Sequence, residues 1–257
     1  MDLGIVGRNT LVTGASRGLG RAIALALAAE GARVTALARS RERLDELAAA
    51  AESGPGSISA CVCDLGDAAA IAGLAGLLAR TDILVLNTGG PPPGALAEVA
   101  DATWATQFES MFLSVVRVTR LALAGMRSRR FGRIIAVVSS GVIQPIPQLG
   151  ISNALRLAVV GWAKTLSAEV AGDGVTVNCV APGRIATDRV TELDRGRALR
   201  EGVALEEVVR QSQSSIPAGR YGDAAEFAAL VSFLASARAS YMTGGVIRVD
   251  GGMIRSL

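Results

Sequence analysis

Residues 10–30 read TLVTGASRGLGRAIALALAAE, and this stretch decides the fold. A short β-branched run ends at Thr13, glycines follow at Gly14, Gly18 and Gly20, and a helix is predicted over Arg21 to Glu30. Glycine lets backbone amides approach a pyrophosphate, and the free N–H groups of a helix N-terminus favour that anion. A glycine triplet alone also occurs in ordinary tight turns, but the order strand, turn, helix favours a dinucleotide-binding turn.

The alternation of short strands and longer helices continues to the C-terminus. Further strands are predicted at RVTALA, SISACVC, DILVLN, GRIIAVVSS, VTVNCVA and VIRVD. The longer helices between them are predicted over Phe108 to Arg129, Ile151 to Val170 and Glu226 to Ala235. We therefore predict an α/β fold, a doubly wound (Rossmann) seven-stranded parallel sheet with helices on both faces, in which residues 1–257 form a single domain.

Two long stretches interrupt this alternation. Thr88 to Ala100 is rich in proline and glycine, and Arg184 to Ser215 is polar, charged and only partly helical by pattern. Loops of this length in a compact domain are usually functional. We expect residues 184–215 to form a mobile substrate loop.

The composition narrows the classes of function. The formal net charge is only +3 and the basic residues are dispersed, so we expect neither nucleic acid nor membrane as a partner. The sequence contains no histidine, which excludes Ser-His-Asp triads and histidine-ligated metals, and we predict no metal site. Cys61, Cys63 and Cys179 lie in predicted strands and are expected to be core thiols. Because the N-terminal residues lack the apolar run of a signal peptide, we expect a cytoplasmic protein.

Several motifs, in order along the chain, resemble the short-chain dehydrogenase/reductase family. They are TGASRGLG, Asp64 in CDLGD, Asn87-Thr88-Gly89, Pro182-Gly183 with Thr187, and TGGVIRVDGG. The resemblance runs from about Gly7 to Gly252 and is to members of the 3-oxoacyl-[acyl-carrier-protein] reductase kind. It implies an oxidoreductase acting on a small molecule. The cofactor-binding residues that it implies are Gly14, Ser16, Arg17, Gly18, Leu19, Gly20, Arg39, Asp64, Leu65, Asn87, Gly89, Pro182, Gly183, Ile185 and Thr187.

The end of the second predicted strand indicates which cofactor is bound. An acidic residue there would hold a ribose 2′-hydroxyl, whereas a basic one would pair with a 2′-phosphate. The sequence is ALARSRER, with no acid at Ala36 to Ser40, while Arg39 follows the strand and Arg17 lies in the glycine turn. Since guanidinium bonds phosphate bidentately, we predict that NADP(H) is preferred over NAD(H). The alternative is that Arg39 and Arg41 are solvated surface charges.

The catalytic positions depart from the family pattern. The resemblance implies a Ser that bonds the substrate oxygen, a Tyr that passes the proton, a Lys four residues later and an Asn on the preceding helix. Ser139 fits the first position, but Ser152 stands at the Tyr position, Arg156 at the Lys position and Met111 at the Asn position. Lys164 lies eight residues beyond Arg156, roughly 12 Å along the helix, and cannot substitute in place. Serine is a much weaker acid than phenol and arginine stays charged, so ordinary carbonyl reduction should be slow.

Three functional interpretations remain open. The first is a reductase in which Ser139 and Ser152 polarise an oxygen, Arg156 holds the ribose or the developing anion, and water supplies the proton. The substrate of such a reductase could also be a conjugated alkene. The second is a catalytically impaired protein that binds NADP(H) or a ligand as a sensor, and the third is a partner subunit of an active relative. Structural roles are the alternative for each residue: Ser139 ending a strand, Ser152 capping a helix and Arg156 lying on its surface.

The chain is also predicted to self-associate. The segments Phe108 to Met126 and Ile151 to Leu166 carry more apolar residues than one sheet-facing stripe needs. In the family that the sequence resembles, the matching helices form a dimer bundle. We therefore expect a homo-oligomer, either a dimer or a tetramer.

Overall fold

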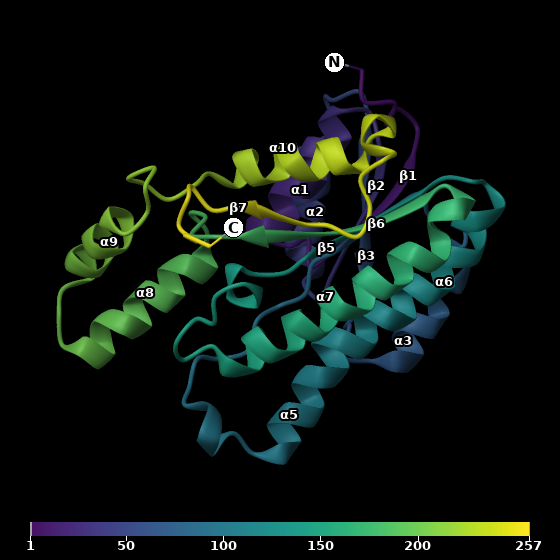
Figure 1. Ribbon diagram of the computed structural model, residues 1–257. Helices are drawn as coiled ribbons and strands as arrows, with labels where there is room; N and C mark the ends of the chain where they lie inside the picture. The colour runs from purple at the N-terminus through teal and green to yellow at the C-terminus, as the bar shows by residue number, and fades with distance from the viewer. Residues whose placement is uncertain (1, 257) are drawn as a thin grey trace.

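The computed structural model describes residues 2–256 as seven parallel strands flanked by helices (Figure 1). The spatial order is β3-β2-β1-β4-β5-β6-β7, with every neighbouring pair parallel. The strands are β1 (Asn9–Thr13), β2 (Arg33–Ala38), β3 (Ser57–Val62), β4 (Ile83–Leu86), β5 (Gly132–Val137), β6 (Val175–Pro182) and β7 (Val246–Val249). The predicted fold class is confirmed.

Helices cover both faces of this sheet, which explains why the central strands are apolar on both sides. All residues of β4 and β5 are buried. One face carries α1 (Gly18–Ala29), α2 (Arg41–Ala49) and α10 (Ala224–Ala235), which pack through side chains such as Ile23, Leu44 and Phe227. The other carries α3 (Ala68–Gly73), α4 (Ala75–Leu78), α6 (Ser114–Ser128) and α7 (Gly150–Val170).

The long helix predicted over Phe108 to Arg129 is composite. Helix α5 (Asp101–Phe108) leads through a π-helical turn, Glu109–Leu113, into α6. The predicted helix therefore begins seven residues too late, because α5 is half-exposed and carries only a weak apolar periodicity. A π-helical turn inside a helix often marks a functional site, and this one presents Met111.

The stretch from residue 184 to 215 is more regular than the sequence indicates. It folds into α8 (Asp188–Glu201) and α9 (Leu205–Ser214), which project beside the sheet and which we call the lid helices (Figure 1). Helix α8 is polar over most of its surface, so its apolar periodicity is hard to detect. Ion pairs along the helices, such as Arg197 with Glu201, support them instead.

The three cysteines are free thiols: Cys61 lies in β3, Cys63 directly follows it, and Cys179 lies within β6. Cys63 and Cys179 are buried, and Cys61 is half-buried. Burial raises the pKa of the Cys179 thiol to about 12, so it remains protonated. They are packing residues of the sheet. None of the helices within residues 2–256 has the length and apolar character that a bilayer crossing requires.

Candidate active site and cofactor cleft

The predicted site residues gather where the strands end at their carboxyl edge. Strand β1 lies between β2 and β4, so the connections leave it in opposite directions, and the topological switch point lies between the loops that follow β1 and β4. Open parallel sheets bind ligands at such a switch point. The loops after β5 and β6 extend this edge (Figure 1).

Close backbone packing explains two of the three glycines in the turn after β1. A Cβ on Gly20 would lie 2.2 Å from the carbonyl oxygen of Gly14, and one on Gly14 would lie 2.5 Å from the carbonyl oxygen of Asn87. Gly14 also has φ +59°, a conformation that favours glycine. The turn is thus pressed against the loop that follows β4.

Asn87 and Thr13 join these two loops by hydrogen bonds. Asn87 Nδ2 donates to the Gly14 carbonyl at 3.1 Å, and Thr13 Oγ1 donates to the Asn87 carbonyl at 3.0 Å. Thr13 Oγ1 also accepts from the Asn87 N–H at 2.8 Å. The side chain of Asn87 therefore shapes the glycine turn, a role that the motif does not reveal.

The residues around this turn fit a dinucleotide. Helix α1 starts at Gly18, three residues earlier than predicted, and its N-cap Arg17 makes no side-chain cap bond. Its first turn contains no acidic residue to repel an anion or to occupy the free N–H groups. Gly89, on the facing loop, has open space around its Cβ position. A pyrophosphate would therefore be held by the backbone of residues 16–20.

The predicted adenosine side of the switch point follows β2 and β3, which lie on the side of β1 away from β4. The Ala15 N–H donates to the Leu37 carbonyl at 3.1 Å, which fixes the turn beside the end of β2. Arg39 follows β2 and is exposed, as is Asp64 after β3, whose Oδ1 accepts from the Gly66 N–H. Leu65 is half-buried beside Asp64.

The nicotinamide side of the predicted cleft follows β6. Pro182 ends that strand, and the Gly183 N–H donates to the Val249 carbonyl at 2.9 Å. Ile185 is buried and pairs with Gly222, while Thr187 is the N-cap of α8. The fifteen predicted cofactor residues therefore share one edge of the sheet.

Ser139 lies two residues beyond β5 with its side chain fixed by the backbone. It is the N-cap of a 3₁₀ turn over Ser140–Val142, and its Oγ accepts from the Gly141 N–H at 3.0 Å. Because the oxygen accepts this bond, the hydroxyl hydrogen is available for another partner. Ser139 therefore caps this turn, a role that the sequence did not suggest, and its donor stays free.

Ser152 does not cap the helix in which it lies. Helix α7 begins at Gly150, its N-cap is Leu149, and no side chain makes the cap bond. Ser152 is only 7% exposed, and its Oγ accepts from Arg156 Nε at 3.3 Å. Its hydroxyl hydrogen, like that of Ser139, is left to donate.

Arg156 is not a surface residue of α7. Its Nη1 donates to the Val137 carbonyl at 2.8 Å, and its Nη2 donates to the Gly89 carbonyl at 3.2 Å and the Thr88 carbonyl at 3.4 Å. Within residues 2–256 it has no carboxylate partner. Burial, and secondarily the charge of Arg189, lower the pKa of Arg156 to about 10, so it is a cation at neutral pH. The site therefore holds an uncompensated positive charge beside Ser152.

Apolar packing surrounds this group on the α5–α6 side. Met111 is 3% exposed and packs with Ile151 and Leu155, the neighbours of Ser152 along α7. The position predicted for a water-holding Asn is therefore filled by a thioether. The Arg156 side chain, which is longer than that of a lysine, reaches the backbone carbonyls of Val137 and Gly89 directly.

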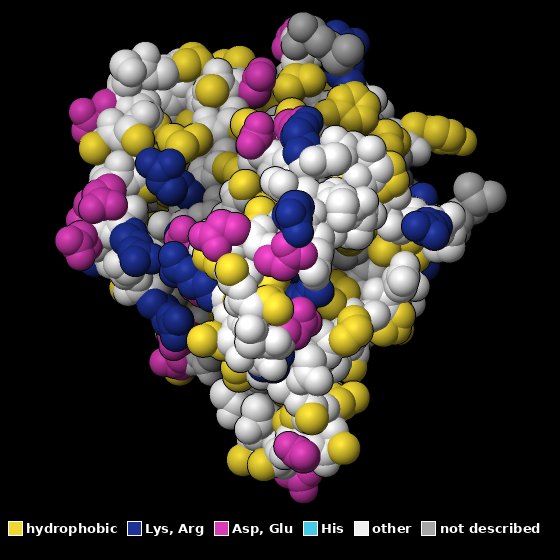
Figure 2. Space-filling view, turned by 90° about the vertical axis from the view of Figure 1, so that its left-hand side faces the viewer, with side chains coloured by type: hydrophobic (Ala, Val, Ile, Leu, Met, Phe, Trp, Pro, Cys, Tyr) yellow, Lys and Arg dark blue, Asp and Glu magenta, His cyan; other side chains and the backbone are white. Residues whose placement is uncertain are grey.

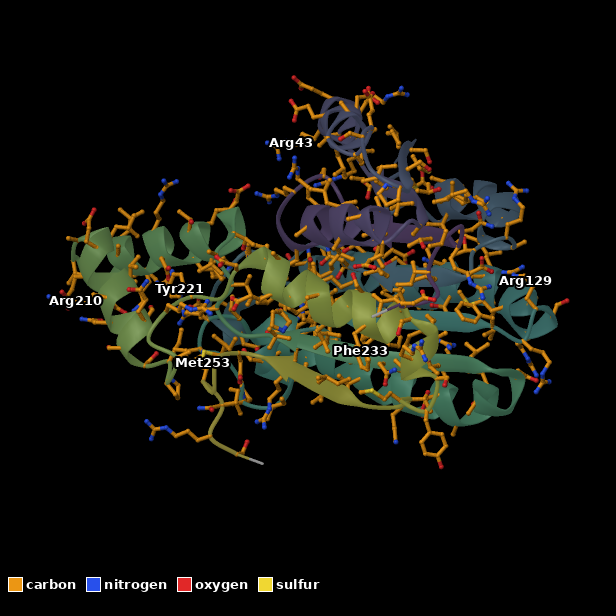
Figure 3. All side chains as sticks on the ribbon, turned by 90° about the horizontal axis from the view of Figure 1, so that it is seen from above. Arg43, Arg129, Arg210, Tyr221, Phe233 and Met253 are labelled. Atoms are coloured by element: carbon orange, nitrogen blue, oxygen red, sulfur yellow. The ribbon has the colours of Figure 1, made fainter. Side chains whose placement is uncertain are left out.

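Other contacts of the lid helices could not be read from sequence spacing. Arg184 pairs with Asp194 of α8, which is 1% exposed, and Tyr221 Oη donates to Asp194 Oδ2 at 2.7 Å. Figure 3 shows Tyr221 beside the lid helices. Burial raises the pKa of Tyr221, so it is a poorer acid than a free phenol. Tyr241, the second tyrosine, is fully exposed.

The fold is that of a Rossmann-type α/β protein, a class that binds ligands at this edge of the sheet. Residues 14–254 match the family model described as Enoyl-(Acyl carrier protein) reductase. The chain is 36% identical over 250 residues to the 3-oxoacyl-[acyl-carrier-protein] reductase FabG of Salmonella typhimurium, covering 96% of this chain and 97% of the relative. A putative ketoacyl reductase of the granaticin polyketide synthase of Streptomyces violaceoruber is 36% identical over 249 residues, or 95% and 92% of the two chains.

Solved structures agree with this assignment. The L-sorbose reductase of Gluconobacter frateurii, complexed with NADPH and L-sorbose, superposes with a TM-score of 0.93 at 32% identity over 100% of both chains. The NADPH-dependent reductase YwfH, involved in bacilysin biosynthesis, gives 0.92 at 29% identity over 98% of this chain and 100% of its own. The chain belongs to the short-chain dehydrogenase/reductase family of oxidoreductases.

Proposed function

We propose that this chain is an NADP(H)-dependent oxidoreductase that transfers hydride to or from a small carbonyl, alcohol or conjugated compound at Ser139, Ser152 and Arg156. The observation that supports the proposal is the bond from Arg156 Nε to Ser152 Oγ, which holds a cation beside a hydroxyl group whose hydrogen is left to donate. The cofactor would be held by the backbone of residues 16–20 and by the loops after β4 and β6. Bound nicotinamide supplies or accepts the hydride.

The chain's own residues act on the oxygen of the substrate. Both serine oxygens accept a bond from the protein, so both hydroxyl hydrogens are left to donate, and the substrate oxygen is their proposed acceptor. Arg156 supplies positive charge in a partly desolvated place, where fixed charges stabilise a developing anion best. Neither serine nor arginine gives up a proton near neutral pH, so water supplies it.

The preference for NADP(H) rests on charge at the end of β2. No acidic residue lies at 36–40, and the exposed Arg39 is free to meet a 2′-phosphate. The NADPH that the L-sorbose reductase binds supports the same choice.

Conjugated substrates suit this site better than simple ketones. Hydride addition to an isolated ketone leaves an alkoxide that needs a proton at once, whereas addition to an enoyl group leaves a stabilised enolate. The oxygen donors and Arg156 can hold an enolate until water protonates its carbon. The matching family model carries the description of an enoyl reductase, which supports this second candidate.

A matched pair of substrates tests both candidates. Purified protein is titrated with NADPH and NADH by fluorescence, and NADPH oxidation is then followed with the crotonyl and acetoacetyl thioesters of N-acetylcysteamine. We expect NADPH to bind more tightly and the crotonyl thioester to be reduced faster. Faster reduction of the acetoacetyl thioester would support carbonyl chemistry, and tight binding without turnover of a wider panel would favour the sensor or partner-subunit role.

We further propose that the chain works in the cytoplasm as a homo-oligomer. Apolar side chains on α5 and α7 stay exposed in the isolated chain, with Phe108 at 40% and Leu157 at 53%. Exposed apolar groups on neighbouring helices support a subunit interface. Light scattering at micromolar concentration should give a dimer or tetramer mass, and a monomer mass would overturn the assembly.

A further inference from the structure

The first turn of the lid helix α8 lies against the glycine turn. Thr187, which precedes α8, has its side chain 3.7 Å from the Cβ position of Gly18. One turn further along, Glu192 Oε1 accepts from Arg17 Nη1 at 2.9 Å. Asp188 Oδ2 lies 4.0 Å from the same nitrogen. Two lid carboxylates therefore face the guanidinium of the glycine turn.

The same turn of α8 is also attached to the loop that follows β4. Arg189 Nη2 donates to the Pro91 carbonyl at 2.7 Å, and the guanidinium lies 3.2–3.5 Å from the Cβ position of Gly90. Arg189 is also 3.9 Å from Glu192. The first turn of α8 thus bridges the loops after β1 and β4, between which the cofactor would bind. Figure 2 shows that basic and acidic side chains are intermixed on this side of the molecule.

The guanidinium of Arg17 is therefore bonded to a lid carboxylate when no phosphate is bound. Glu192 remains an anion, because the hydrogen bond from Arg17 holds the pKa of its carboxyl below the usual range. A 2′-phosphate and the Glu192 carboxylate would repel each other at one guanidinium. Glu192 occupies Nη1 of Arg17, so a phosphate that takes this nitrogen together with a second N–H of the guanidinium displaces the carboxylate.

We infer that Glu192 competes with the 2′-phosphate of NADP(H) for Arg17, and that phosphate binding there releases the lid from the glycine turn. This inference rests on the proposed NADP(H) binding. Glu192 is thereby a residue that lowers the affinity for NADP(H) without affecting that for NAD(H). Arg189 keeps the other end of the lid attached when Arg17 changes partner.

The test is a double-mutant cycle on cofactor affinity. The dissociation constants of NADPH, NADH, 2′-AMP and 5′-AMP are measured for the wild type, Glu192→Gln, Arg17→Ala and the double variant. Because both side chains of the pair are about half exposed, we expect Glu192→Gln to tighten NADPH and 2′-AMP about two- to fivefold and to leave NADH and 5′-AMP unchanged. The gain in affinity should vanish in the Arg17→Ala background and shrink at about 0.5 M salt, because salt screens exposed charges.

A matched control and a second readout complete the design. Glu201→Gln removes an exposed carboxylate of the same helix, which pairs with Arg197 at 2.7 Å, and should change no affinity. Trypsin cleavage at the lid arginines should be faster with 2′-AMP than with 5′-AMP. Equal gains for NADPH and NADH, no gain for either, or protection of the lid by 2′-AMP would each overturn the inference. If the wild type binds neither NADPH nor NADH, the proposed function itself fails.

Discussion

Arg156 Nε donates to Ser152 Oγ at 3.3 Å, one turn of α7 apart, and the same guanidinium reaches carbonyls after β4 and in β5. The bond makes the serine oxygen an acceptor and directs its hydrogen elsewhere. The guanidinium also joins α7 to the end of β5 and to the loop after β4. A tyrosine and a lysine in these places would provide an acid and its activator. This pair provides a donor and a fixed charge.

Loss of either hydroxyl should slow hydride transfer with little effect on cofactor binding. Removing one donor to a developing oxyanion typically lowers kcat about 10²–10³-fold. We expect Ser139→Ala and Ser152→Ala each to fall in this range, measured by single-turnover oxidation of NADPH with the best substrate. Ser140→Ala, at the neighbouring buried position, is the control. Unchanged turnover in the Ser152→Ala variant would leave that residue without a catalytic role.

Restoring the missing acid should change which substrates react. In Ser152→Tyr/Arg156→Lys with Met111→Asn, a phenol, an ammonium and an amide stand at the family's positions. A positioned acid contributes about 10²–10⁴-fold, so reduction of the acetoacetyl thioester should rise by up to that factor. Ser152→Phe in the same background, which lacks the hydroxyl, is the control. A gain shared by the Phe variant would show that shape, rather than acidity, is responsible.

The pH dependence should reflect Arg156 alone. Its pKa is lowered to about 10, so the guanidinium loses its charge as pH rises through that value, earlier than an exposed arginine. Stabilisation of the anion is then lost, and kcat/KM should be level from about pH 6 to 9 and fall towards pH 10. Arg156→Met should show a low activity without this alkaline fall. An acid limb near pH 6 in the wild type would point to another ionising group.

The ion pair between the buried Asp194 of α8 and Arg184 should stabilise the fold. Asp194 is 1% exposed and holds both Arg184 and Tyr221, and breaking a buried pair commonly costs about 3–5 kcal/mol. Because Arg184 keeps a partly exposed side chain, we expect Asp194→Ala to lose about 3 kcal/mol, the lower end of that range, in urea unfolding. Arg195→Ala, on the exposed side of α8, should stay within about 0.5 kcal/mol of the wild type.

Cofactor preference should follow the charge at Arg39. Hydrogen bonds between charged groups contribute about 1.5–3 kcal/mol, equivalent to roughly 10–100-fold in affinity. Arg39→Asp should weaken NADPH by that factor and strengthen NADH, since a carboxylate can hold the 2′-hydroxyl. Fluorescence titration of both cofactors measures the ratio. Arg41→Ala is the control because Arg41 pairs with Asp45 instead.

Local patterns determined the sheet, the glycine turn and the family, because strand alternation and glycine spacing are properties of neighbouring residues. Position in the sequence also predicts that Ser152, Arg156 and Met111 stand where the family has Tyr, Lys and Asn. Helix boundaries were less well predicted: the polar helix α8 has little apolar periodicity, and the π-helical turn before α6 leaves no local signal.

Tertiary structure alone decided what these replacements do. Ser152 accepts from Arg156, and Arg156 reaches carbonyls 19 and 67 residues away in the chain. Arg17 and Glu192 meet across 175 residues. The partners of a charged side chain depend on which segments the sheet brings to one edge. A one-dimensional pattern names such side chains, but only their packing in three dimensions selects their partners.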